Sequence, residues 1–141
     1  MVTHATGLFP CPFTHTVFDY FITMYYPMRS IITPRYKYIL NLAPEREYPF
    51  ASDLWGSASW QGIRKRGDKM MGQRSVAAFL HRPKEELYDL KADPNELRNL
   101  AGDAAHTEAL TDLRRRLRTW QRETNDPWMI LYRVEDPAFN R

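Results

Sequence analysis

Residues 86–101 constrain the fold of this chain more than any other stretch. The first five of them alternate with the two-residue period of a short strand that has one apolar face. The motif Asp93-Pro94-Asn95-Glu96 then follows, in which the aspartate can accept from free N–H groups and the proline suits a first helical position. We therefore expect a strand that leads directly into the start of a helical turn.

A longer helix is expected between about Ala104 and Glu123. Asp103 precedes it as an N-cap, and Asn125-Asp126-Pro127 ends it. Four apolar residues recur inside it at spacings of three, four and three, which places them on one side of a helix. Such a stripe normally faces a core, so this helix is expected to cover a sheet; the stripe consists of Leu110, Leu113, Leu117 and Trp120.

The rest of that sheet is expected from residues before position 43. Tyr36, Tyr38, Leu40 and Leu42 alternate with other residues, and an apolar run ending at Thr33 precedes them. The two runs indicate an antiparallel hairpin with its loop at Thr33-Pro34-Arg35. The fold class that follows is α+β, with a small antiparallel sheet of three to four strands covered by one C-terminal amphipathic helix.

Residues 43–82 are expected to be a long insertion, because prolines and glycines interrupt every periodic pattern in it. Trp55 and Trp60 are expected to anchor it on the core, with a helical turn around them. Residues 73–80 suit a short helix or a short strand. A connection of this length is usually functional or mobile.

Composition limits the class of protein. The 141 residues are 43% hydrophobic, which suits one domain with a modest core. Lys plus Arg is 20 against 17 Asp plus Glu, so the net charge of +3 is weak evidence for a polyanionic partner. One cysteine, Cys11, excludes an intramolecular disulfide. No apolar run is long enough to span a membrane and no signal peptide is visible, so the sequence leaves the localisation open.

Several short motifs occur in one order along this chain. They are Tyr25-Tyr26-Pro27-Met28-Arg29, Tyr36-Lys37-Tyr38-Ile39-Leu40-Asn41, Pro49-Phe50, Leu54-Trp55, Glu86-Leu87-Tyr88-Asp89, Asp93-Pro94, Asn99-Leu100-Ala101, Trp120-Gln121 and Glu123-Thr124-Asn125-Asp126-Pro127-Trp128. Together they resemble the C-terminal region of the sulfatases. Within that family, the tyrosine-rich run and the closing Asp-Pro-Trp resemble the branch of N-sulfoglucosamine sulfohydrolase, the heparan N-sulfatase, whereas Glu-Leu-Tyr-Asp is shared across sulfatases. The resemblance implies that the whole enzyme hydrolyses sulfate esters or N-sulfate groups on glycans.

The resemblance divides the chain into three parts. Residues 23–129 correspond to the sulfatase C-terminal subdomain, residues 1–22 form an irregular N-terminal margin, and residues 130–141 form a C-terminal tail. Tyr20 and Phe21 stand where the resembled enzymes carry His-Glu. The margin therefore departs from the family.

The catalytic half of a sulfatase is not recognisable in this sequence. The resemblance implies a formylglycine made from a Cys/Ser-x-Pro-x-Arg motif beside a calcium ion in the full-length enzyme. Cys11 is followed at once by Pro12, His15 stands where arginine belongs, and no serine meets the motif. No acidic cluster suggests calcium ligands, and His4, His15, His81 and His106 lack metal-ligand spacing. We expect no catalytic residue, no metal and no cofactor in this chain, and no hydrolysis by the chain alone.

Four residues are candidates for substrate binding. Arg29 can hold a sulfate or carboxylate through two hydrogen bonds, although a buried ion pair would explain it equally well. Tyr25 and Tyr26 could flank a sugar ring, but packing is the commoner use of such residues. His81 could face an anionic glycan, with solvated loop charge as the alternative.

The partners follow from the same interpretation. The expected partner is a sulfatase catalytic domain, encoded upstream or separately, and a sulfated glycan would be reached through the whole enzyme. The apolar run before Arg29, or the second face of the sheet, would meet that domain, so without it an exposed patch could cause self-association. The alternative function is a small basic module that binds a polyanion through residues 64–66 and 114–118; a nucleic acid is the less favoured ligand and no membrane partner is expected.

Overall fold

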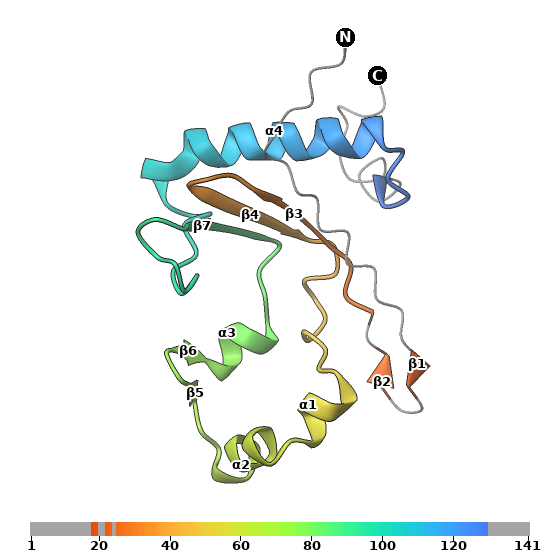
Figure 1. Ribbon diagram of the computed structural model, residues 1–141, viewed down its shortest axis with the longest axis vertical. Helices are drawn as coiled ribbons and strands as arrows, with labels where there is room; N and C mark the ends of the chain where they lie inside the picture. The colour runs from red at the N-terminus through yellow and green to blue at the C-terminus, as the bar shows by residue number, and fades with distance from the viewer. Residues whose placement is uncertain (1–17, 20–21, 24, 130–141) are drawn as a thin grey trace.

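The computed structural model describes residues 18–19, 22–23 and 25–129. It has an upper part, in which one long helix lies across a small sheet, and a lower part built from short helices and strands (Figure 1). In chain order the elements are β1 (Phe18–Asp19), β2 (Ile22–Thr23), β3 (Met28–Ile32), β4 (Tyr36–Asn41), α1 (Ser52–Gly56), α2 (Ala58–Arg66), β5 (Met70–Met71), β6 (Arg74–Ser75), α3 (Val76–Leu80), β7 (Glu85–Asp89), the 3-10 turn η1 (Ala104–His106) and α4 (Thr107–Glu123).

The main sheet has three antiparallel strands in the order β3-β4-β7. Tyr38 of β4 lies opposite Ile31 of β3 on one side and Leu87 of β7 on the other, so these three side chains share one face. The β3–β4 loop closes where expected, since the N–H of Thr33 donates to the carbonyl of Tyr36 at 2.8 Å. The predicted hairpin and the α+β class are confirmed.

Helix α4 covers that face of the sheet, as its apolar stripe predicted (Figure 1). Leu110, Leu113 and Leu117 are buried against the strands, and Trp120 packs at the border of the same core. The side chain of Asp103 accepts from the N–H of Ala105, so it caps the 3-10 turn that leads into α4. The buried core consists of Ile31, Tyr38, Leu40, Leu87, Leu100, Leu110, Leu113 and Leu117.

The expected helical start at Asp93-Pro94-Asn95-Glu96 is wrong. The chain forms turns there, and Glu96 has a positive φ of 54°, which no helix tolerates. Asp93 accepts from backbone N–H groups as predicted, but its donors are Leu97 at 2.7 Å and Arg98 at 2.8 Å. A carboxylate bound to two successive N–H groups stabilises this turn without any helix following it.

Residues 43–82, here called the lobe, are more regular than expected. They contain α1, α2, α3 and the two-stranded ladder β5–β6. Trp60 is buried as an anchor, but it stacks on Phe50 at 4.3 Å between ring centroids, and Phe79 lies 5.1 Å from Phe50. These aromatic rings form a cluster of the lobe that is separate from the core beneath α4.

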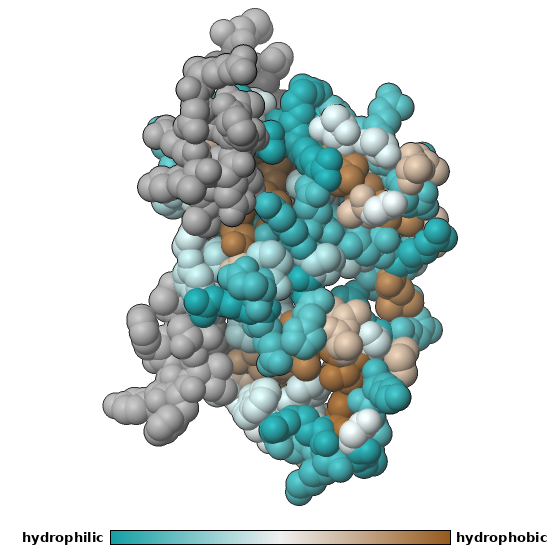
Figure 2. Space-filling view, turned by 180° about the vertical axis from the view of Figure 1, so that it is seen from behind, coloured by the Kyte–Doolittle hydropathy of each residue, from teal (hydrophilic) through white to brown (hydrophobic). Residues whose placement is uncertain are grey.

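The second face of the sheet is covered within this chain. Ile39 and Tyr88 are each 5% exposed, and Asn41 and Glu86 beside them are also buried. The large hydrophobic side chains that are exposed in the described part of the chain are Leu54, Met70 and Leu97, none of which lies in β3, β4 or β7. Seen from behind, hydrophobic residues appear in separate groups on a largely hydrophilic surface (Figure 2). Self-association stays a prediction.

Most of the N-terminal margin and the tail lie outside the described residues, as do Cys11, His4 and His15. At the end of the margin, Phe18–Asp19 and Ile22–Thr23 pair as a short antiparallel ladder. None of the described helices is long and apolar enough to cross a membrane.

Candidate functional site

Arg29 is buried in an ion pair between β3 and the residues that follow α4. Its Nε donates to Oδ2 of Asp126 at 2.8 Å, and its Nη2 donates to Oδ1 at 2.7 Å. Gln121 Nε2 and the N–H of Trp128 donate to the same carboxylate. Burial alone would raise the pKa of Asp126, but these hydrogen bonds, with that from Arg29 the largest, hold it below its ordinary value. The guanidinium therefore points into the fold.

Tyr25 lies at the surface between two partners. Its ring centroid is 5.5 Å from that of Trp128, and the guanidinium carbon of Arg46 lies 5.7 Å from its centroid. Tyr25 and Trp128 are both half-buried, whereas Arg46 is exposed. Two half-exposed rings beside a cation are suited to contact a sugar ring that carries a negative group.

Tyr26 points the other way and is buried. Its ring meets that of Tyr48 edge to face, with centroids 5.2 Å apart. Its hydroxyl has no hydrogen-bond partner among the described residues. Burial is the main reason that the pKa of Tyr26 rises to about 12, although the nearby positive charge of Arg82 opposes the rise.

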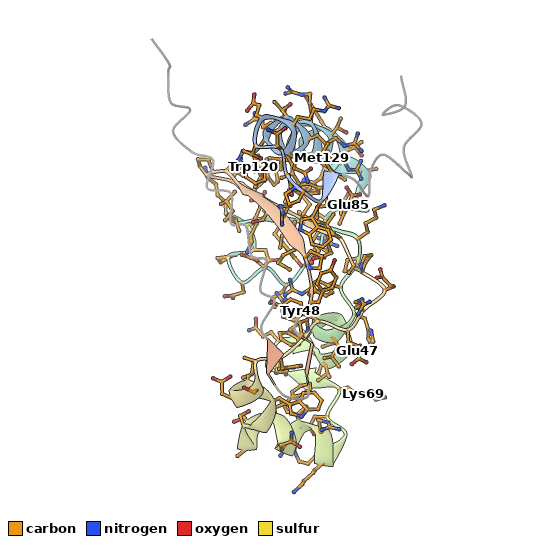
Figure 3. All side chains as sticks on the ribbon, turned by 90° about the vertical axis from the view of Figure 1, so that its right-hand side faces the viewer. Glu47, Tyr48, Lys69, Glu85, Trp120 and Met129 are labelled. Atoms are coloured by element: carbon orange, nitrogen blue, oxygen red, sulfur yellow. The ribbon has the colours of Figure 1, made fainter. Side chains whose placement is uncertain are left out.

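His81 is exposed at the end of α3, on the lobe. Its Nε2 lies 3.8 Å from Oε1 of Glu47, too far for a hydrogen bond. Glu47 and Tyr48 lie between the sheet above and the helices of the lobe below (Figure 3). Three of the four candidates therefore adjoin the segment 45–48: Tyr25 lies beside Arg46, Tyr26 beside Tyr48, and His81 beside Glu47. The fourth, Arg29, lies apart from them on the α4 side of the sheet.

A buried polar cluster lies where the lobe meets the sheet, and the sequence analysis did not predict it. Glu86 accepts from Asn41 Nδ2 at 2.7 Å and from the hydroxyl of Tyr88. Arg82 Nη1 lies 3.6 Å from Glu86, and its guanidinium stacks 4.3 Å from the ring centroid of Tyr48. Burial and the contact with Glu86 raise the pKa of Tyr88. Only the i, i+4 spacing of Arg82 and Glu86 hinted at this pair.

The two basic segments of the sequence differ in how many of their positive charges are paired with carboxylates. On α4, Arg114 pairs with Glu85, while Arg115 and Arg116 both pair with Asp112. In the lobe, residues 64–66 are exposed in the last turn of α2. The charge of α4 is therefore largely neutralised locally, which weakens the prediction of a polyanion site that includes it.

No group of three or more His, Cys, Asp and Glu side chains within residues 18–19, 22–23 and 25–129 could hold a metal ion. The Cys/Ser-x-Pro-x-Arg motif is absent from the 141 residues. Among the described residues, a hydroxyl lies beside a possible base at Tyr36, whose Oη is 3.4 Å from Nδ1 of His106. Neither residue is among the four candidates for substrate binding.

Comparison with known proteins identifies related enzymes. The chain is 34% identical over 111 residues to N-sulphoglucosamine sulphohydrolase of Homo sapiens, covering 77% of this chain. It is 30% identical over 111 residues to the ulvan-active sulfatase of Formosa agariphila, and 28% identical over 118 residues to the delta 4,5-hexuronate-2-O-sulfatase of Bacteroides thetaiotaomicron. These matches cover 77% and 78% of this chain, respectively. No family model matches the chain.

The chain spans only part of these relatives. The matched region is 22% of the human protein, 19% of the Formosa protein and 24% of the Bacteroides protein. The resemblance to a sulfatase C-terminal region is confirmed for about three quarters of the chain.

Proposed function

Because the chain is homologous to the C-terminal region of sulfatases, we propose that it forms the C-terminal subdomain of an enzyme that removes sulfate or N-sulfate groups from glycans. The three relatives are an N-sulphoglucosamine sulphohydrolase, an ulvan-active sulfatase and a delta 4,5-hexuronate-2-O-sulfatase, so all three names denote a sulphohydrolase or a sulfatase. The first of them has the highest identity of the three, so a glycan with N-sulfated glucosamine is the substrate we favour.

One observation supports this proposal above the others. The tyrosine-rich run and the Asp-Pro-Trp motif, which together carry the resemblance to the sulphoglucosamine branch, contact each other in the fold. Arg29 binds Asp126, and Tyr25 packs on Trp128, across about a hundred residues of sequence. Two motifs that form one structural unit are a stronger sign of a retained subdomain than either motif alone.

The four candidate residues take two different roles in this proposal. Tyr25 and His81 reach solvent and are proposed to contact the glycan directly. Arg29 and Tyr26 are buried and are proposed to act through other residues. Arg29 holds Asp126, which in turn accepts from the N–H of Trp128, so it positions the residues that follow α4. Tyr26 packs against Tyr48 and so positions the segment 45–48.

The chemical step is assigned to the part of the enzyme that this chain does not contain. In the resembled family a formylglycine and a calcium ion supply the nucleophile and the positive charge at the sulfate. The residues of this chain bind and orient the glycan and exclude water from one side. The proposed partner is therefore a sulfatase catalytic region, and the chain alone is proposed to be inactive.

Activity measured with and without such a region tests the proposal. The full chain alone, and the full chain placed in frame behind the catalytic region of a sulphoglucosamine sulphohydrolase, would both be assayed on glucosamine N-sulfate. We expect no hydrolysis by the chain alone and measurable hydrolysis by the fusion.

A fusion that carries Asp126→Ala provides the internal control, since it keeps the catalytic region and disrupts only the subdomain. It should lose most of the restored activity. Hydrolysis by the chain alone would overturn its assignment as a non-catalytic subdomain, and a folded but inactive fusion would overturn the assignment to this branch.

A further inference from the structure

The net positive charge of this chain comes from the lobe. Residues 43–82 contain seven Lys and Arg against four Asp and Glu, whereas the remaining residues contain 13 of each. The formal charge of +3 for the whole chain therefore equals the surplus of this one segment. A local surplus of this kind attracts anions even when the protein as a whole is nearly neutral.

Four of the seven cations of the lobe have partners. Arg66 pairs with Asp68, Arg74 donates to the carbonyl of Glu96, and Arg82 lies against Glu86. Arg46 lies 3.9 Å from Glu45. Among the described residues, the exposed cations of the lobe that have no ion pair are Arg64, Lys65 and Lys69. They lie within six residues, at the end of α2 and just after it, so they form one group.

The end of α2 does not require these charges. Gly67 has a φ of 67° and ends the helix, while the N–H of Asp68 donates to the carbonyl of Ile63 at 3.1 Å. Backbone groups therefore satisfy the end of the helix. Cations at a helix C-terminus also stabilise it, but only modestly when they are exposed.

Arg64 is held in place by the aromatic cluster of the lobe. Its guanidinium carbon lies 4.6 Å from the ring centroid of Trp55, and that ring lies 5.8 Å from Phe50 between centroids. Stacking on a ring occupies the face of a guanidinium and leaves its N–H groups free at the edge. Such an edge is suited to the oxygens of a sulfate or a carboxylate.

The location of the group is also outside the candidate site. Lys69 lies below Glu47 and Tyr48, which adjoin the candidate site (Figure 3). Hydrophilic residues also dominate the lower end of the molecule in the rear view (Figure 2). A ligand that contacts both this group and Tyr25 would have to extend along the lobe, as a glycan chain can.

We propose that Arg64, Lys65 and Lys69 bind the sulfated chain of a polysaccharide, at a distance from the sugar that reacts. The choice of a sulfated glycan as the polyanion rests on the proposed function. A single-stranded nucleic acid fits less well, because one face of the Trp55 ring is covered by Arg64 and base stacking needs an open aromatic face.

The test measures binding of the full chain to a heparin oligosaccharide by calorimetry over a range of salt concentrations. The test variant is Arg64→Gln/Lys65→Gln/Lys69→Gln. The control variant, Arg115→Gln/Arg116→Gln/Arg122→Gln, removes the same charge from exposed positions of α4. We expect the test variant to bind about tenfold or more weakly and with a shallower dependence on salt, and the control to change less than about threefold.

Three results would overturn the proposal: equal weakening by both variants, unchanged binding by the test variant, or stronger binding of a DNA oligonucleotide than of heparin. Lys65→Gln/Lys69→Gln serves if the triple variant fails to fold, because both side chains are exposed and form no hydrogen bond or ion pair with the described residues. The assay needs no catalysis, so a failure here leaves the hydrolysis experiment on glucosamine N-sulfate to decide the proposed function independently.

Discussion

Arg29 and Asp126 are 97 residues apart in sequence and are joined by two buried hydrogen bonds, at 2.8 and 2.7 Å. Their side chains are 5% and 1% exposed. The pair connects an outer strand of the sheet, β3, to the turn that follows α4. It therefore fixes the far end of the helix on the sheet, where the hydrophobic stripe has already ended.

Removing one partner of this ion pair should strongly destabilise the fold. Asp126→Ala leaves the guanidinium of Arg29 buried without a counter-charge, and such a loss typically lowers the free energy of unfolding by about 3–5 kcal/mol. Urea denaturation followed by tryptophan fluorescence measures it. Asp68→Ala removes the exposed partner of Arg66 and should have little effect. Equal losses from the two substitutions would contradict the structural role of the buried pair.

Removing the hydroxyl group should change the stability of the fold differently at two buried tyrosines, Tyr26 and Tyr38. The hydroxyl of Tyr26 is unpaired, so Tyr26→Phe removes only a desolvated polar group and should leave stability unchanged or raise it by up to about 1 kcal/mol. The hydroxyl of Tyr38 donates to Glu85 at 2.6 Å, so Tyr38→Phe should lower stability by about 1.5–3 kcal/mol. Thermal melts of both variants compare them directly, and a destabilised Tyr26→Phe would show that its hydroxyl is bound.

The side chain of Asn99 acts as a partner for the outer edge of β7. Its Oδ1 accepts from the N–H of Leu87 at 2.9 Å and from that of Ala101 at 3.0 Å, and its Nδ2 donates to the carbonyl of Glu85 at 3.0 Å. Asn99→Ala should lower stability by about 1–3 kcal/mol and speed hydrogen exchange at Leu87. Asn99→Asp keeps the acceptors and should lose less; equal exchange at Leu87 in the wild type and both variants would contradict this role.

Acid should weaken the contact between α4 and the sheet. Burial alone would raise the pKa of Glu85, but hydrogen bonds from Arg114 and Tyr38 lower it below the ordinary 4.5. The unfolded chain then binds this proton more readily, so the stability contributed by Glu85 is present above pH 4.5 and is lost as pH falls through the lower folded pKa.

Glu85→Gln removes this titration. The variant should be less stable than the wild type at pH 7 and should lose less stability between pH 5 and 3, as thermal melts at each pH would show. Glu108→Gln, an exposed change on α4, should keep the profile of the wild type. Identical profiles for all three proteins would exclude Glu85 as a source of the acid sensitivity.

The upper part of the fold could be predicted because its patterns are long and regular. The spacing of Leu110, Leu113 and Leu117 fits a helix and no strand, and the alternation around Tyr38 fits a strand and no helix. The lobe could not be predicted in the same way. Its helices are five to nine residues long and are separated by Ser57 and Gly67, so no period repeats often enough to be recognised.

The contacts of the candidate residues could not be predicted from the sequence, and their role in binding stays a prediction. The sequence singled out Arg29 and left a buried ion pair open as its explanation, and only the fold brings Asp126 to it. The cluster of Arg82 with Asn41 and Glu86 depends on the packing of β4 beside β7, which no local pattern encodes. The helix start expected at Asp93-Pro94-Asn95-Glu96 is replaced by a turn, in which Glu96 has a positive φ and its carboxylate accepts from Lys37 of β4 at 2.8 Å. This contact joins residues 59 positions apart, so no local pattern encodes it.

The aromatic cluster of the lobe, described above as separate from the core, affects how the sheet assembles. Strands β4 and β7 pair across a chain excursion that contains the whole lobe, and closing a loop costs entropy that grows only slowly with its length, by about 0.6 kcal/mol for each doubling. Since Phe50 and Trp60 pack within the excursion, it can collapse before the strands meet. A change in the length of this segment should therefore cost the sheet little, as long as Tyr48 and Arg82 keep their contacts with Tyr26 and Glu86.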